Sequence, residues 1–423
     1  MKNQEKHSIN KLDNSRKRSK WALNYQKQCQ EDLKKVGMPS RNAEYWKFAS
    51  PNLWENTDLI SVSGKNFSKN DTQYLENKPE YYVEFVDGII DPVTLQNLKK
   101  KLKECEISNF EESVCDQFHW ANKLLGKAET KARKSYERPF ALLNGGGSSQ
   151  GIFLNCKESP RKPIHIFYSG EIEEKVNIRH LLKINCNTEL HIIEHFSGNA
   201  NYNVVTEGFL DSTSILNHNR LVSRFLRNSI ITHFFINCME SSVVKTIGIT
   251  LNNGAVRNET FLNLEGSQCD VTLAGLGVGR NQSSICDNTV FVAHLENSCK
   301  SRQIIKNVLT QGAKAVFQGK IYVDPKAQKT DGYQMSNGLI LDEKSNFLVK
   351  PELEIYADDV ICSHGSTSGS LNMEHLFYLK SRGISTNEAR KILVEAFLEE
   401  VIEEISDLEF SKFVRKEIQD TLI

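Results

Sequence analysis

The stretch KPELEIYADDVICSHGS, residues 350–366, contains two short segments that have the pattern of β-strands. From 351 to 357, apolar residues alternate with polar or aromatic ones, which is the period of a half-buried strand. An aspartate pair interrupts the alternation, and a second apolar run begins at Val360. These residues therefore predict a strand, a break and a second extended segment.

Two candidate metal ligands, Cys362 and His364, lie two positions apart in the second segment. If this segment is extended, both side chains point to the same side, roughly 7 Å apart, and Ser363 faces away. A thiolate and an imidazole suit a transition metal. Two ligands are too few to hold one, so another strand or another chain must supply more. The alternative is a buried structural cysteine beside a histidine that bonds a strand carbonyl.

The residues from Pro139 to about 370 carry short apolar runs separated by Asn, Asp, Ser and Gly. Runs such as 190–196, 230–236 and 243–251 have strand length, and no crossover helices separate them. The pattern predicts an all-β body of roughly 230 residues. A sandwich and a propeller both fit, and Asn-rich corners favour a β-solenoid, whose coils bury their faces by stacking.

The flanking regions have helical patterns instead. Residues 1–20 hold seven Lys or Arg against two acids, which indicates a disordered leader. We expect 21–139 to be mostly helical, with one helix over 116–132, and 371–423 to form a C-terminal helical region. In that region a capping box at Ser385 starts a helix. We expect this helix to bury Ala389, Ile392, Leu393, Ala396, Phe397, Val401 and Ile405.

Charge and hydropathy exclude several classes of function. Fifty-three basic and 53 acidic residues cancel, so no overall field favours nucleic acid. No apolar run approaches the roughly 20 residues that a membrane span needs. The polar N-terminus has no secretory pattern, which predicts a cytoplasmic protein.

Two further patterns carry no chemistry of their own. The glycine-rich residues 275–280 lack the helix and G-x-x-G tail of a dinucleotide site, so we interpret them as a β-turn. The ten cysteines include no C-x-x-C pair. We expect each of them except Cys362 to be a small buried apolar residue.

The stretch 351–367 also matches a family signature, P-x-L-E-I-x-A-D-D-V-x-C-S-H-G-[ST]-T. It is followed at 376–384 by L-F-Y-L-x-S-R-G-I, and the match extends upstream over 316–323 and 327–330. The chain thus resembles the SufD branch of the SufB/SufD family, part of the SUF iron–sulfur cluster assembly machinery. SufB-like motifs carry glutamates on both sides of the histidine, whereas this chain has Ser363 and Gly365.

The resemblance implies a right-handed parallel β-helix core over 140–370, between helical regions 1–139 and 371–423. It implies a non-catalytic scaffold subunit, with a transient iron–sulfur cluster at the junction with a SufB-like partner and no stably bound cofactor. Candidate cluster ligands are His364 and Cys362. A SufC ATPase would dock on the C-terminal helices, and the candidate docking residues are Phe377, Tyr378, Arg382, Ala389 and Phe397. A flavin on the complex and a homodimer of the isolated chain are also compatible with the family.

Two alternatives remain open. A β-helix also suits a carbohydrate-active enzyme, for which Glu259, Asp270 and Asp287 are candidate carboxylates. The other alternative is a purely structural subunit whose partner alone supplies the cluster ligands.

Overall fold

The structure is a computed structural model that describes residues 18–55, 78–132, 136–171, 175–251 and 253–422. The predicted disordered leader, 1–20, lies almost entirely outside these residues. No described helix is long and apolar enough to cross a membrane.

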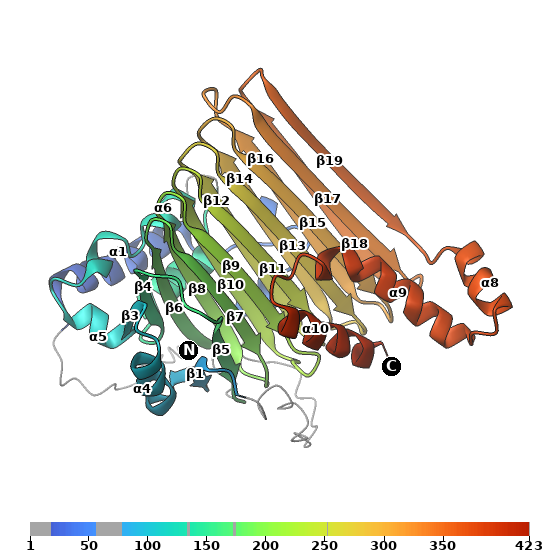
Figure 1. Cartoon of the computed structure of the whole chain (residues 1–423), viewed down its shortest axis with the longest axis horizontal. Coiled ribbons are helices and arrows are strands. Elements are labelled where there is room, and N and C mark those ends of the chain that lie inside the picture. The colour runs from blue at the N-terminus through green and yellow to red at the C-terminus, as the bar shows by residue number, and fades with distance from the viewer. Residues whose placement is uncertain (1–17, 56–77, 133–135, 172–174, 252, 423) are drawn as a thin grey trace, which may run out of the picture.

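Two long sheets form the body of the protein (Figure 1). In spatial order, sheet A contains β19 (Val360–Gly369), β17 (Thr330–Ile340), β15 (Lys300–Leu309), β13 (Asp270–Gly279), β11 (Val243–Thr250), β9 (Ile215–Val222), β7 (Glu189–Phe196), β5 (Ile164–Ser169), β1 (Tyr81–Val86) and β2 (Ile89–Ile90). Sheet B contains β18 (Asn346–Ile355), β16 (Lys314–Val323), β14 (Ile285–His294), β12 (Ala255–Leu264), β10 (Ser229–Cys238), β8 (Asn201–Leu210), β6 (Lys175–Ile184), β4 (Ile152–Cys156) and β3 (Cys105–Asn109).

From β4 onward, consecutive strands alternate between the two sheets, and each strand pairs in parallel with the strand two places along the chain. One coil therefore contributes one strand to each sheet, which is a parallel β-solenoid. The predicted mainly β fold with a solenoid core is confirmed, and the sandwich and propeller alternatives are wrong. The predicted turn over 275–280 is also wrong, because Gly275 to Gly279 lie inside β13.

Alternate residues of each strand face the space between the two sheets, which we call the lumen. Ile230, Phe234 and Ile236 of β10 are buried there, next to Val256 and Leu262 of β12. Burying a side chain of this size contributes about 1.5–3 kcal/mol. Because each coil covers only its neighbours, this stabilisation depends on stacking, and the last coil at each end lacks one neighbour.

The C-terminal helices cover the outer face of sheet A. α9 (Thr386–Ile402) and α10 (Leu408–Thr421) follow α8 (Met373–Ser381), and α9 packs over β13 and β15. Residues Val394, Leu398 and Val401 of α9 are buried against the sheet. The predicted buried face is therefore partly wrong, since Ile392 is 37% exposed. Sheet A contacts the face of α9 that carries Val394, Leu398 and Val401, and the helical period alone does not predict which apolar face is buried.

The N-terminal part combines helices with strands that extend the sheets. Its helices are α1 (Lys20–Val36), η1 (Glu44–Trp46), α2 (Asn52–Glu55), α4 (Pro92–Lys101), α5 (Phe110–Cys115), η3 (Trp120–Lys123), α6 (Lys127–Ala132) and α7 (Pro139–Gly147). The single helix expected over 116–132 is wrong, because it is divided into η3 and α6. Gly126 separates the two with a φ of +78°, a conformation that glycine adopts without steric strain.

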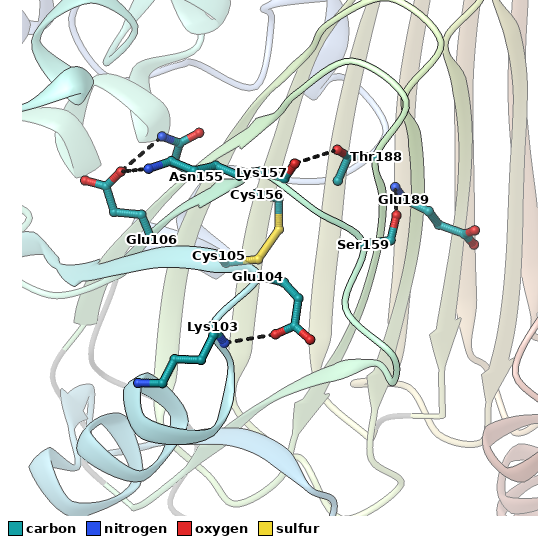
Figure 2. Close-up of a disulfide and its surroundings, with 10 residues drawn as sticks. All are labelled: Lys103, Glu104, Cys105, Glu106, Asn155, Cys156, Lys157, Ser159, Thr188 and Glu189. Atoms are coloured by element: carbon teal, nitrogen blue, oxygen red, sulfur yellow. Dashed lines mark hydrogen bonds and ion pairs between the residues drawn. A yellow bond between two sulfur atoms is a disulfide. The ribbon is translucent and has the colours of Figure 1, made fainter.

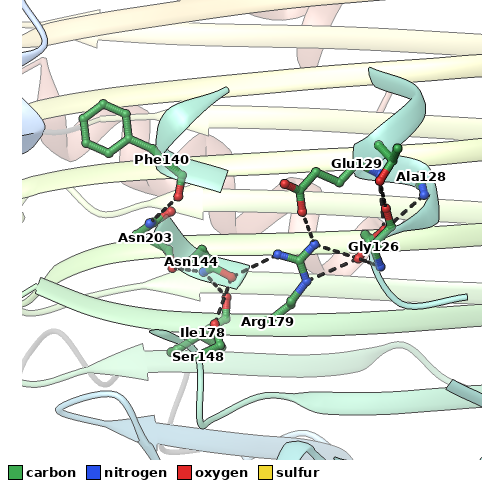
Figure 3. Close-up of polar contacts among 11 residues, drawn as sticks. Gly126, Ala128, Glu129, Phe140, Asn144, Ser148, Ile178, Arg179 and Asn203 are labelled. Atoms are coloured by element: carbon green, nitrogen blue, oxygen red, sulfur yellow. Dashed lines mark hydrogen bonds and ion pairs between the residues drawn. The ribbon is translucent and has the colours of Figure 1, made fainter. Parts of the chain in front are cut away.

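A buried ionic cluster ties the N-terminal helices to the outer face of sheet B (Figure 3). Arg179 of β6 lies 2.5 Å from Glu129 of α6 and 2.8 Å from Glu207 of β8. Glu207 also accepts backbone N–H bonds from Gly126 and Ala128. Burial raises the pKa of Glu207 even though Arg179 opposes the shift. The cluster is satisfied only when the helices are docked.

A disulfide joins Cys105 of β3 to Cys156 of β4, where the two strands pair antiparallel and place these residues opposite each other (Figure 2). The expectation that these cysteines are simple apolar residues is therefore wrong. Cys186 is exposed, which also departs from the expectation, whereas Cys238, Cys269 and other cysteines are buried.

Candidate metal-ligand site at the open end of the solenoid

The C-terminal end of the solenoid leaves two strand edges open. β19 pairs only with β17, and β18 pairs only with β16, so the outer edge of each has no partner among the described residues. Ile361 on β19 is 74% exposed and Tyr356, just after β18, is 57% exposed. Figure 1 shows β19 at the rim of the stack, with α8 extending away from it. Unpaired edges with exposed apolar side chains are typical of surfaces that pair with another chain.

Cys362 lies on this open edge with its thiol directed toward the lumen. It pairs in register with Gly332, and a Cβ built on Gly332 would lie 3.2 Å from the Cys362 sulfur. The thiol also packs near Ile321 and Val323 at the mouth of the lumen. Partial burial raises the pKa of Cys362, so the free thiol is protonated at neutral pH. A metal would therefore have to displace a proton to bind it.

His364 lies two residues further along the same strand and pairs in register with Gln334. The alternation of the strand places its side chain on the same face as that of Cys362, as the spacing predicted. His364 is exposed, and its ring makes no hydrogen bond with any described residue. No group of three or more His, Cys, Asp or Glu residues that could hold a metal occurs in the described ranges. The two donor atoms would need further ligands from outside this part of the chain.

Residues singled out on the C-terminal helices fall into two groups. Phe377 and Tyr378 of α8 are 74% and 56% exposed, and the Arg382 guanidinium lies 5.3 Å from the Tyr378 ring. Ala389 is buried. Phe397 is partly buried against the apolar residues between α9 and sheet A, and its backbone carbonyl accepts a hydrogen bond from the Lys306 ammonium. α8 therefore presents an open apolar surface, and α9, which packs on both α8 and sheet A, connects the two.

The carboxylates considered for a glycosidase do not line a common groove. Glu259 and Asp287 are both buried on the outer face of sheet B, where Arg257 contacts each of them. The Arg257 guanidinium stacks on Trp46 at 3.9 Å, which closes this cluster under the N-terminal residues. Asp270 is exposed at the start of β13, in the other sheet. The geometry does not support paired acid–base chemistry at these residues.

Sequence reasoning missed a polar column beneath His364. Gln303, Gln334 and His364 are successive register partners on β15, β17 and β19. Both glutamine side chains are fully buried in the lumen and are joined by a 2.8 Å hydrogen bond. Glutamine within an apolar strand pattern was the available signal, but the register between coils is needed to place it under the histidine.

The fold and the site define a β-solenoid protein that carries a cysteine and a histidine, both candidate metal ligands, on an edge strand with no further strand beside it among the described residues. Residues 167–397 match the family model "SUF system FeS cluster assembly, SufBD core domain", and the chain belongs to this family. The Escherichia coli iron–sulfur cluster assembly protein SufD is 27% identical over 392 residues, covering 89% of this chain and 88% of that protein. A SufBD family iron–sulfur cluster assembly protein of Synechocystis sp. is 24% identical over 402 residues, covering 88% and 85%. The chloroplastic protein ABCI7 of Arabidopsis thaliana is 23% identical over 412 residues, covering 92% and 82%.

Proposed function

We propose that this chain is a non-catalytic scaffold subunit on which an iron–sulfur cluster is built at the junction with a SufB-like partner. His364 would supply one ligand, Cys362 a second, and the partner the rest. The observation that carries the proposal is the exposed His364 on an unpaired edge strand, on the same face as a thiol. Imidazole and thiolate both bind iron, and neither is committed to another side chain in the described ranges.

The cluster would be cargo in this scheme. Cys362 would lose its proton as iron binds, and the neutral imidazole of His364 would donate a ring nitrogen. Because the two donors cannot complete a coordination sphere alone, the cluster would form only while the partner covers the open end. Its release would follow from separation of the two subunits.

We further propose that an ATPase of the SufC type docks on α8 and uses ATP to move the two subunits apart. The exposed Phe377 and Tyr378 support this role, because an apolar helix surface attached beside the open end would transmit force to it. We place this work in the cytoplasm, where metal-binding thiols stay reduced and where the Cys105–Cys156 bridge is open to reduction.

The test is the His364→Ala variant, co-purified without oxygen with its SufB- and SufC-type partners. We expect the complex to form normally and its iron and sulfide content to fall by at least about tenfold. Ser363→Ala is the matched control, because Ser363 is also exposed on β19 but its side chain points to the opposite face from that of His364. The His364→Cys variant, which keeps a metal donor, should recover part of the cluster.

Normal iron and sulfide in the His364→Ala complex would sink the ligand assignment and favour a purely structural subunit. Cys362→Ser separates the two donors. A loss of cluster with unchanged thermal stability assigns the thiol as a ligand, whereas lower stability with normal cluster content assigns it to packing.

A further inference from the structure

The lumen below His364 contains a buried oxygen that lacks a hydrogen bond. Gln334 is fully buried, and its Nε2 donates to Oε1 of Gln303 at 2.8 Å. Among the described residues neither its own Oε1 nor Nε2 of Gln303 has a hydrogen-bond partner. A buried amide oxygen without a donor destabilises a protein by about 1–3 kcal/mol, so most such groups are satisfied in folded chains.

Two neighbours of Gln334, Gly319 and Gln303, surround the nitrogen end of its amide. A Cβ built on Gly319 of β16 would lie 2.1 Å from the Gln334 nitrogen, so the glycine provides the space that the amide occupies. Because the nitrogen is committed to Gln303, one coil earlier, the oxygen is the group left for the coil that follows. Only β19 follows in sheet A, and its residue in register with Gln334 is His364.

His364 is well placed to supply the missing donor. Register partners on adjacent strands lie about 4.8 Å apart, and their side chains share one face. The ring of His364 is exposed and makes no hydrogen bond with another described residue, so none of these residues holds its side chain in one rotamer. Because the two residues are register partners, a rotation of the His364 side chain toward the lumen would direct a ring N–H at the Gln334 amide.

We propose that Gln334 is a positioning residue for His364, with its Oε1 accepting a hydrogen bond from one ring N–H. This bond selects one tautomer and leaves the other ring nitrogen, with its lone pair, facing the mouth of the solenoid. Ligating histidines are commonly oriented by an acceptor on the second ring nitrogen. Gln303 acts one step behind, because its Oε1 accepts the hydrogen bond from Nε2 of Gln334. The functional meaning of this hydrogen bond rests on the proposed role of His364 as a ligand, whereas the hydrogen bond itself does not depend on that role.

The test reads the tautomer of His364 directly, in the metal-free full chain labelled with ¹⁵N-histidine. Ring ¹⁵N shifts are recorded at about pH 8, above the ordinary titration range of histidine side chains, and His364→Ala identifies the signals. We expect one tautomer to predominate in the native chain. Gln334→Met, which keeps the size but removes the acceptor, should reduce the tautomer ratio about fivefold. Gln334→Glu, which keeps an acceptor, should restore it.

Ser336→Ala is the matched control. Ser336 is also buried in the lumen, and its hydroxyl has no hydrogen-bond partner among the described residues, but it pairs in register with Ser366 rather than with His364. Its loss should leave the His364 tautomer unchanged. Native-chain shifts near those of free imidazole would overturn the proposal, as would a Gln334→Met spectrum identical to the native one. Because no metal is present, such a result leaves the cluster experiment on His364 unaffected, and a failed cluster experiment leaves the tautomer result standing.

Discussion

The two ends of the solenoid are completed differently. At the N-terminal end, sheet A finishes with the antiparallel strand β2 and with α4 packed on β1. Sheet B finishes with the antiparallel strand β3, which the Cys105–Cys156 disulfide attaches to β4. At the C-terminal end, β18 and β19 each pair with a strand on one side only within the described part of the chain. Folded proteins normally cover or disrupt exposed strand edges, which is why we propose the end that is left open as the surface for a partner.

This contrast separates residues that maintain the fold from residues that act on a partner. Near the closed end, buried charges and histidines are bonded within the chain, as Arg179 and His180 show. At the open end, His364 and Ile361 are exposed and contribute little to the fold. Substitutions near the closed end should therefore lower stability, and substitutions at the open end should lower association.

The largest expected effect is at Arg179. Its replacement by leucine, Arg179→Leu, leaves Glu129 and Glu207 buried without their cation. We expect the free energy of unfolding to fall by about 3–5 kcal/mol, measured by urea denaturation. The control is Arg302→Leu, because the Arg302–Glu400 pair is exposed and should contribute under about 1 kcal/mol. Equal losses in the two variants would contradict the difference drawn between buried and exposed pairs.

Low pH should first lower the stability of the coils near the N-terminal end of the solenoid. Burial lowers the pKa of His165 to about 3, and it lowers the pKa of His180 and His191 to about 4. Of the later coils, β14 carries His294, whose pKa burial lowers to about 4. The unfolded chain binds these protons below about pH 6.5, where the folded chain does not, so stability is full above that pH. It falls as the pH drops toward 4, by up to about 1.4 kcal/mol per pH unit for each histidine.

Hydrogen exchange followed by mass spectrometry at pH 7 and pH 5 locates this loss. We expect β5, β6 and β7 to lose protection before β15 and β17 do. His180→Gln should reduce the pH dependence, and His375→Gln, at an exposed position, should not. Uniform loss of protection along the solenoid would show that acid acts on the whole stack at once.

The smallest effect on folding is expected at the open edge. Ile361→Lys places a charge on an exposed side chain of β19, so the free energy of unfolding should change by no more than about 0.5 kcal/mol. Affinity for the SufB-like partner, measured by calorimetry, should fall about tenfold or more, because a charge is buried in the junction. Ile89→Lys is the matched control at the closed end, where Ile89 is 64% exposed. Equal loss of affinity in both variants would remove the assignment of the open end as the junction.

The period-two pattern was sufficient to predict that Cys362 and His364 share one face of a strand, because alternation is local in the chain. The position of Gln334 beneath His364 could not be predicted in this way. It depends on the register between β17 and β19, which the intervening sheet B strand and two corners determine.

Other misses have the same cause. Cys105 and Cys156 are separated by 51 positions, and spacing alone does not define a disulfide. A glycine-rich run looks like a turn, yet a Cβ on Gly277 would lie 2.3 Å from the Asn307 side-chain oxygen in the next coil. Gly277 is therefore required because the Asn307 side chain of the adjacent coil occupies the space of a Cβ. Local pattern predicted the elements, and contacts between coils decided what each residue does.

The alternation of strands between two sheets has a consequence for recognition. Since β18 and β19 belong to different sheets, the rim of this protein offers two parallel seams at a fixed spacing. A single extended peptide could pair with only one of these two strand edges, and the other edge would remain exposed to water. Pairing with both edges requires a partner whose own end presents two strands at the same spacing. The fold of the partner therefore limits which proteins can bind here, whatever their side chains.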